Sequence, residues 1–237
     1  MTKILNSIIS DLKKQGDPLK AKNCLWFFKT GPGEYGEGDK FLGLTSPQVR
    51  TIVKKYQKII TLSQVMSLLQ NPYHECRLTA LLILVYQFSH GDNRSKKIIF
   101  NLYLAHANYI NNWDLVDLSA PSIVGAYCFE QQDYSILYQL SLSQDLWEKR
   151  ISIISTLFLI KKGVFLPTLT IAKTLLKDPH DLIHKAVGWA LREVGKVDQK
   201  ILIKFLDKYT STMPRTALRY SIEKFPEPLR QHYLKLV

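Results

Sequence analysis

The sequence has little that would stabilise a fold other than an apolar core. It contains three cysteines among 237 residues, Cys24, Cys76 and Cys128, and none of them forms a Cys-x-x-Cys pair. An odd number of widely spaced cysteines argues against a disulfide framework, and the spacing does not suggest a zinc site. We therefore expect buried thiols in a reducing compartment. Hydrophobic residues make up 46% of the chain, which is enough for a sizeable core.

Long apolar runs are also missing. The longest, such as ALLILVY at 80–86, fall far short of the roughly 18 residues that cross a bilayer. The N-terminal segment MTKILNSIISDLKKQG carries charges on both sides of a short apolar stretch, unlike a secretory signal. These absences predict a soluble cytoplasmic protein with no membrane partner.

Motifs of common enzymes and cofactor sites are absent as well. The six histidines form no His-Glu-x-x-His motif, and His180 and His184 lack a third ligand, so no metal is expected. No Gly-x-Ser-x-Gly elbow occurs, and no cysteine has an evident base partner. The glycine-rich segment 30–43 lacks the Lys-Ser/Thr ending of a phosphate-binding loop and follows a helix, which favours a surface loop at one end of a binding groove. We expect no cofactor.

What the sequence does have is basic charge. Lysine and arginine number 32 against 20 acidic residues, which gives a net charge of +12. A pI of about 9.5 makes nucleic acid the leading class of partner. Association with ribosomes, or a charge that only prevents aggregation, remains an alternative.

Apolar residues recur at helical spacing along nearly the whole chain, and strand-like alternation with Asn-Gly or Asp-Gly turns is missing. The prolines of Asp17-Pro18 and Ser46-Pro47 mark helix starts. The pattern predicts an all-α protein with helices near 2–15, 18–29, 47–57, 61–70, 74–89, 92–108, 112–127, 132–142, 146–161, 165–176, 181–195, 198–208, 213–224 and 227–236.

A weak repeat runs through these helices. A charged residue followed by an apolar block recurs at spacings of 37, 36, 35 and 34 residues, beginning at Arg77, Asp114, Arg150, Lys185 and Arg219. Such a period with two helices per unit is typical of HEAT or armadillo solenoids. The expected architecture is a single curved α-α superhelical solenoid of HEAT-like repeats, one domain over 1–237 with a glycine-rich loop at 30–43.

The segment NNWDLVDLSAP at 111–121 is the strongest candidate for chemistry. Asn111 or Asn112 would cap a helix on which Trp113 and Asp117, four residues apart, share one face. Asp114 lies about 100° round the helix, where it would stabilise the helix dipole. For Asp117, an ion pair with Arg150 and a functional role are equally good interpretations.

Two further tryptophans precede arginines at similar repeat positions, Trp147 before Arg150 and Trp189 before Arg192. A tryptophan in a helical repeat is usually part of the core. Tryptophans at matching positions beside an aspartate and an arginine shift the balance towards function.

With these residues the sequence resembles the AlkD-like DNA alkylation repair family, which comprises HEAT-like-repeat DNA glycosylases. The matching segments span most of the chain in the family's order: GEGDKFLGLTSPQVR (36–50), YHECRLTALLIL (73–84), NNWDLVDLSAP, LWEKRISII, HKAVGWALREVGK (184–196) and MPRTALRYSIEKFP (213–226). The resemblance implies an N-glycosylase that releases cationic N3- or N7-alkylated purines from double-stranded DNA. The resemblance also implies catalysis without base flipping and association with the nucleoid when DNA is bound. We expect a monomer, and because no lyase nucleophile is evident we expect a monofunctional enzyme.

The resemblance further implies roles for single residues. Trp113 and Trp189 would lie against the deoxyribose of the lesion, Asp117 would be the catalytic carboxylate, and Arg150 would hold a phosphate. Phe27 or Phe28 would be a further DNA contact, at a position where the best-studied members carry a tyrosine. This change keeps open a non-catalytic HEAT-repeat module that binds damaged or branched DNA; a protein-binding scaffold is a third alternative.

Sequence-independent phosphate contacts would come from basic side chains of the repeats. For each candidate, a structural or solvated role is an equal alternative. The candidates are Arg77, Arg150, Lys185, Arg192, Arg215 and Arg219.

Overall fold

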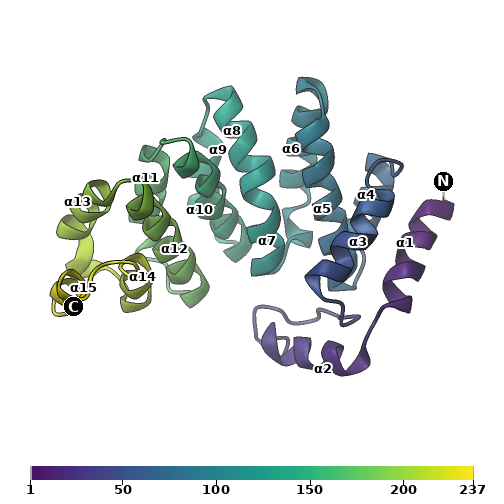
Figure 1. Cartoon of the computed structure of the whole chain (residues 1–237), viewed down its shortest axis with the longest axis horizontal. Helices are drawn as coiled ribbons and strands as arrows, with labels where there is room; N and C mark the ends of the chain where they lie inside the picture. Colours follow the sequence, from purple (N-terminus) through teal and green to yellow (C-terminus); the bar gives the residue numbers. More distant parts are fainter. Residues whose placement is uncertain (1, 237) are drawn as a thin grey trace. The chain divides into compact units, whose positions relative to one another are not determined.

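The computed structural model describes residues 2–236, and the part of the chain that it describes contains helices and no β-strand. The prediction of an all-α fold is therefore confirmed. The chain divides into two compact units, Met1–Ser119 and Ala120–Val237 (Figure 1). Each unit is built from successive helices that pack on their neighbours along the chain, as expected for a helical solenoid.

The first unit is organised around α5, which packs against α1, α3, α4 and α6. Its sequence is apolar on nearly all sides, and most of its residues are buried. A helix of this kind is a core helix, which other helices must cover. The elements are α1 (Thr2–Lys14), α2 (Pro18–Phe27), α3 (Ser46–Tyr56), α4 (Leu62–Leu69), α5 (His74–His90), α6 (Asn93–Ala105), the 3-10 turn η1 (Ala107–Tyr109) and α7 (Trp113–Ala120).

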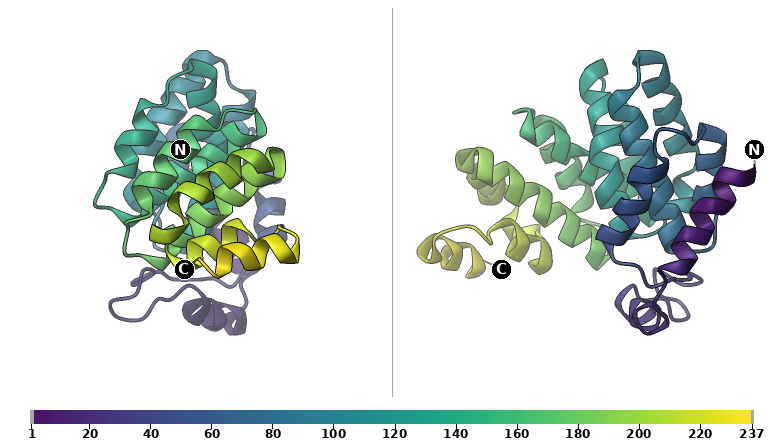
Figure 2. Two further views of the ribbon diagram at one scale, coloured as in Figure 1. Left: turned by 90° about the vertical axis from the view of Figure 1, so that its left-hand side faces the viewer. Right: turned by 45° about the vertical axis from the view of Figure 1, so that its right-hand side comes forward.

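The second unit has two central helices, α10 and α12, which pack against each other. Helix α14 lies against α12. Figure 2 shows the C-terminal helices, drawn in yellow, beside the green helices that precede them. The elements are the π-helical turn η2 (Pro121–Gly125), α8 (Ala126–Gln131), α9 (Ser135–Ser141), α10 (Leu146–Lys161), α11 (Leu166–Leu175), α12 (Asp181–Val197), α13 (Gln199–Tyr209), the 3-10 turn η3 (Thr210–Thr212), α14 (Arg215–Ser221) and α15 (Glu227–Leu234).

The single helix expected over 112–127 is instead α7, the wide turn η2 and then α8, which extends to Gln131. Pro121 lacks an N–H group and its ring crowds the preceding turn, so a wider turn at this point relieves the clash. Gly125, at the end of this turn, packs tightly on α10. A Cβ atom there would lie 2.2 Å from the carbonyl oxygen of Ser155.

The second half of the glycine-rich loop is not the surface loop that we expected, because Asp39 and Phe41 are buried. The backbone N–H of His74 donates to the carbonyl oxygen of Lys40 at 2.8 Å. The buried carboxylate of Glu75 accepts hydrogen bonds from the backbone N–H groups of residues 42, 43 and 44, at 2.9, 2.7 and 3.2 Å. The start of α5 thus fixes the end of the loop.

Trp147 and the three cysteines were expected to be buried, and all of them except Cys24 are. Trp147 is buried. Cys76 and Cys128 are buried thiols, and burial raises the pKa of each to about 12. Cys24 is only half-buried.

Among residues 2–236, no helix is long and apolar enough to cross a membrane, and no cluster of His, Cys, Asp and Glu suits a metal ion.

Candidate active site

Trp113 and Asp117 occupy one side of the short helix α7, one turn apart, and both are half-buried. Ser119, near the end of the same helix, contacts the buried phenol of Tyr103, whose hydroxyl is 2.8 Å from Oγ of Ser119. Ser119 donates its own proton to the carbonyl oxygen of Leu115 at 2.5 Å, so Tyr103 is the donor to Ser119. Burial raises the pKa of Tyr103, and the charge of Asp117 raises it further, while the hydrogen bond with Ser119 acts in the opposite direction. The phenol of Tyr103 is therefore neutral at neutral pH, and the charge of Asp117 is close enough to act on it.

Two polar residues fix where α7 begins. The carbonyl oxygen of Asn112 accepts the first helical hydrogen bond, from the N–H of Val116, and its Oδ1 accepts from the N–H of Trp113 at 2.8 Å. Of Asn111 and Asn112, it is therefore Asn112 that caps α7. Oδ1 of Asp114 accepts from the N–H of Leu115 at 2.9 Å, in agreement with its expected role at the positive end of the helix.

A buried charge cluster joins this helix start to α5 and to the loop. It consists of Asp39, His74, Arg77 and Asp114, which we call the charge cluster below. Nε2 of His74 lies 2.8 Å from Oδ2 of Asp114, and its Nδ1 lies 3.4 Å from Oδ2 of Asp39. Arg77 pairs with the other oxygen of Asp39 at 2.6 Å. Asn112 also donates to Asp39, at 3.3 Å, which ties the loop directly to the cap of α7.

The charges in the cluster support one another. Burial alone would lower the pKa of His74, but the charge of Asp114 and hydrogen bonds to Asp114 and Asp39 outweigh it and raise the pKa to about 9. Burial would raise the pKa of Asp39, yet the hydrogen bond from His74 and the charge of Arg77 hold that pKa below its usual value. At neutral pH His74 is thus an imidazolium and Asp39 a carboxylate.

An aromatic stack covers the cluster and reaches Trp113. The His74 ring lies on Phe41, with centroids 4.8 Å apart, and the Phe28 ring lies 5.0 Å from His74 and 5.1 Å from Phe41. Phe28 in turn stacks on Trp113 at 5.5 Å, and Phe27 meets Trp113 edge-on at 5.9 Å. The structure therefore brings Phe27 and Phe28 together with Trp113. Phe28 is half-buried within the stack, whereas Phe27 is 54% exposed.

Arg77 was expected to be a candidate for DNA contact, and its surroundings favour the structural alternative. Its side chain is only 5% exposed. Besides pairing with Asp39, it donates to the carbonyl oxygens of Asn71 and Pro72 at 3.1 and 3.2 Å. A guanidinium held in this way connects the start of α5 to the loop.

The second unit holds the remaining candidates. Arg150 is buried on α10 and donates to the carbonyl oxygen of Leu182 at 2.8 Å, so it too has a structural contact. Trp189 is half-buried on α12. The neighbouring Gly188 allows α14 to approach closely, since a Cβ atom there would lie 2.4 Å from Cβ of Tyr220.

The other basic candidates of this unit differ in how firmly they are held. Arg192 pairs with Glu223 and lies 3.5 Å from Glu193. Lys185 pairs with Asp181 at 2.8 Å, one turn away on the same helix, and remains accessible. Arg215 donates to the carbonyl oxygen of Leu234 at 3.1 Å. Arg219 is exposed on α14.

Sequence reasoning missed Asp39, Phe41 and His74 as parts of the site. An aspartate in a glycine-rich loop is usually a solvated turn residue, and a lone histidine without a ligand partner suggests no chemistry. A signal was present in YHEC, where His74 and Glu75 open an apolar helix. Polar residues at the start of a buried helix need partners, and a nearby loop can provide them.

Comparisons with known proteins agree with this fold. A solved structure described as "Predicted DNA alkylation repair enzyme from Enterococcus faecalis" is similar to this chain with a TM-score of 0.72 at 15% sequence identity, over 90% of this chain and 98% of that one. At that identity the likeness concerns the fold. A comparison with curated protein sequences finds no match. The sequence profile of the family described as DNA alkylation repair enzyme matches residues 8–225, which is most of the chain. The chain therefore belongs to the DNA alkylation repair enzyme family.

Proposed function

We propose that this protein is a monofunctional DNA glycosylase that hydrolyses the N-glycosidic bond of purines alkylated at N3 or N7 in duplex DNA. The proposal rests on one observation: Trp113 and Asp117 lie one turn apart on the same side of α7. Their half-buried setting beside the neutral phenol of Tyr103 supports it, because a carboxylate partly withdrawn from water acts more strongly on a developing positive charge.

The chemistry needs no general acid. Alkylation at N3 or N7 makes the purine cationic, so the C1′–N bond breaks with its electron pair going to the base, which leaves neutral. The sugar becomes oxocarbenium-like, and a water molecule then forms the new C1′–O bond and loses a proton. Asp117 would stabilise the positive sugar and orient that water. These interactions are strongest in the transition state, which is the condition for catalysis.

The indole of Trp113 would contribute to the same stabilisation, since a tryptophan face attracts a cation by roughly 0.5–2 kcal/mol. Its ring is held by Phe28 at 5.5 Å and Phe27 at 5.9 Å, and this support limits the orientations that it can adopt. The resemblance assigns Trp189 the same role and Arg150 a phosphate contact. Phe27, the exposed member of the aromatic stack, is the better candidate of the two phenylalanines for touching DNA.

Duplex DNA is the proposed partner, bound as a monomer through its backbone and without flipping the base into a pocket. The net charge of +12 supports sequence-independent phosphate contacts. Arg215 and Arg219 are the most accessible of the basic candidates, and Lys185 and Arg192 are only partly exposed. Discrimination would then depend on the lability of the cationic base, so neutral adducts should be poor substrates.

The test is the release of methylated purines from a methylated duplex by the wild type and by Asp117→Asn, with DNA binding measured in parallel. Asp133→Asn is the control, because Asp133 is an exposed residue before α9 that accepts a hydrogen bond from the N–H of Ser135 at 2.9 Å, a role that asparagine keeps. We expect Asp117→Asn to lose release while binding persists, and the control to behave as wild type. Binding without release by the wild type would instead favour the non-catalytic DNA-binding module. The presence of phenylalanine where the best-studied family members carry a tyrosine also favours that alternative.

The product distinguishes a monofunctional enzyme from a lyase. We expect an abasic site in an intact strand, which breaks only after base treatment or addition of an abasic endonuclease. Strand cleavage by the purified protein alone would contradict this part of the proposal.

A further inference from the structure

Helix α2 has no buried residue and presents large apolar side chains to solvent. Trp26 and Leu19 are each 77% exposed. The helix is fixed by its start, where Asp17 accepts from the N–H groups of Leu19 and Lys20 at 3.0 and 3.1 Å, and by Gly43, which lies against its first turn. An exposed tryptophan on a helix anchored in this way indicates a binding surface.

The same helix is basic. Lys20 and Lys22 belong to it, and Lys29 follows its end, with Nζ 5.9 Å from the centroid of the Trp26 ring. Asp17 is the acidic residue at its start, and it pairs with Lys20 at 3.4 Å. Lysine is depleted in the centres of protein–protein interfaces, whereas lysine next to exposed aromatic rings is typical of surfaces that bind single-stranded nucleic acid.

A hollow of about 700 Å³ lies between α2 and residues 43–45. Trp26 and Phe27 provide aromatic surface, Lys22 provides charge, and Asn23 and Thr45 provide hydrogen-bonding groups; none of its lining residues is acidic. This size is within the range of roughly 300–1,000 Å³ that small-molecule sites occupy. The combination suits a nucleotide, which has a flat base, polar edges and a phosphate.

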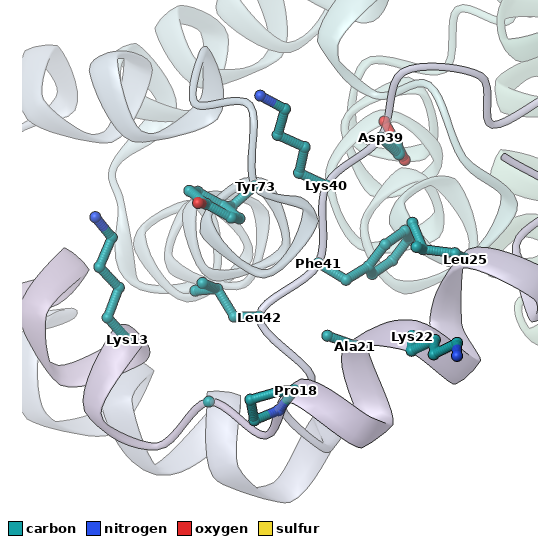
Figure 3. Close-up of a pocket in the computed structure, with 11 residues that line it drawn as sticks. Lys13, Pro18, Ala21, Lys22, Leu25, Asp39, Lys40, Phe41, Leu42 and Tyr73 are labelled. Carbon is teal, nitrogen blue, oxygen red and sulfur yellow. The ribbon is translucent and has the colours of Figure 1, made fainter.

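A second hollow, of about 710 Å³, lies on another side of α2 and is drawn in Figure 3. Nζ of Lys13 lies 5.9 Å from the centroid of the Tyr73 ring there, and Lys40 and Lys22 also line this hollow. Its acidic member, Asp39, is already paired with Arg77 and His74. Lys22 thus lines both hollows, where it can hold a phosphate between them.

We propose that α2 binds an unpaired nucleotide of the DNA, with the base stacked on Trp26 and the phosphate held by Lys22. The two residues are four apart on one helix, which places their Cβ atoms about 5–6 Å from each other, as needed to hold the base and phosphate of one nucleotide. Backbone phosphates beyond it would meet Lys13 and Lys40. The inference rests on the proposed function for the identity of DNA as the partner.

The place of this surface in the first unit connects it to the candidate active site. Phe27, the residue after Trp26, meets Trp113 at 5.9 Å. A nucleotide on Trp26 would therefore lie next to the aromatic stack that supports Trp113. An alkylated base pairs poorly and leaves the nucleotide opposite it unpaired as well, so a site for that opposite nucleotide would favour damaged over intact duplex without taking the lesion itself into a pocket.

The test is equilibrium binding to three labelled, undamaged DNAs at one salt concentration: a fully paired duplex, the same duplex with one unpaired base, and a single strand. We expect Trp26→Ala to weaken binding to the second and third by about 10-fold, as the loss of one base–aromatic stack requires, with little change for the first. Trp26→Phe should keep most of the affinity. Leu142→Ala removes a 71% exposed side chain of the second unit and should change nothing.

Lys22→Gln provides a second measurement. It should weaken binding to the same two DNAs and reduce the slope of log affinity against log salt by about one. Equal losses on all three DNAs, or no loss with Trp26→Ala, would overturn the proposal. So would Trp26-dependent self-association, or Trp26-dependent binding to phosphatidylcholine–phosphatidylserine vesicles, with DNA binding unchanged. Because the DNAs are undamaged, failure of excision and failure of this inference remain distinguishable.

Discussion

Nε2 of His74 lies 2.8 Å from Oδ2 of Asp114, while the other ring nitrogen faces Asp39 at 3.4 Å. One histidine therefore holds a carboxylate of the glycine-rich loop and a carboxylate of α7 at the same time. The side chains proposed for catalysis begin one residue before Asp114 and end three after it. The position of Trp113 and Asp117 thus depends on a buried imidazolium that touches neither of the reacting molecules.

His74→Gln should lower both stability and excision. The change leaves Asp114 without a cationic partner, and breaking a buried ion pair in this way costs about 3 kcal/mol, the lower end of the usual range. Urea unfolding measures the loss, and excision under single-turnover conditions should fall because α7 is less firmly placed. His90→Gln, at the exposed end of the same helix, is the control and should resemble wild type. An unchanged unfolding midpoint for His74→Gln would show that the cluster does not stabilise the fold.

Stability should depend on pH through His74. The folded pKa of about 9 lies above the ordinary value of 6.5, so the folded state holds this proton more tightly. The stabilisation is complete below about pH 6.5 and is lost as pH rises through 9. For Asp39, whose pKa is lowered, stabilisation is present at neutral pH and is lost in acid, below the ordinary value of 3.8. Unfolding midpoints at pH 6.5 and 9.5 should differ for the wild type, and the difference should shrink in His74→Gln.

The helices were predictable because their signals are local. Apolar spacing, the proline of Asp17-Pro18 and short polar connections place most helix ends within two or three residues of those observed. The wide turn at Pro121 was missed because apolar spacing alone predicted one uninterrupted helix over 112–127. A wide turn depends on whether neighbouring helices leave room for it, and here Gly125 allows that room against Ser155. Periodicity does not contain that information.

The site was predictable only in part, and the difference has a physical cause. Trp113 and Asp117 lie four residues apart on one helix, so their shared face follows from the sequence. Asp39 and His74 are 35 residues apart, and their contact depends on how the loop returns to α5. Arg77 has the same repeat position as residues expected to meet DNA, but a carboxylate from the loop turns it into a buried structural residue. Long-range partners of this kind decide which basic side chains remain available.

Gly188 and Gly195, both on α12, should respond differently to alanine. At Gly188 a Cβ atom would lie 2.4 Å from Cβ of Tyr220 and 2.5 Å from the carbonyl oxygen of Ala217, atoms that cannot move without shifting α14. We expect Gly188→Ala to cost about 1–3 kcal/mol. At Gly195 the nearest atom is Cδ2 of Leu202, the end of a flexible side chain, so the gain of about 1 kcal/mol in helix propensity should offset the crowding. Equal thermal stability of the two variants would contradict the close approach of α12 and α14.

Phe27→Tyr tests whether the missing hydroxyl limits excision, given the proposed glycosylase activity. Phe27 is 54% exposed and meets Trp113 edge-on, so a hydroxyl added there can reach a sugar or phosphate oxygen of bound DNA. One such hydrogen bond contributes about 0.5–1.5 kcal/mol, which predicts an increase of roughly 2- to 10-fold in the single-turnover rate. Phe28→Tyr is the matched control, because Phe28 is half-buried and stacks on Phe41 and Trp113, and it should give no increase. A gain from Phe28→Tyr alone would mean that Phe28 is the side chain that faces DNA. No gain from either would mean that the aromatic ring suffices, and the phenylalanine would then cease to favour a non-catalytic protein.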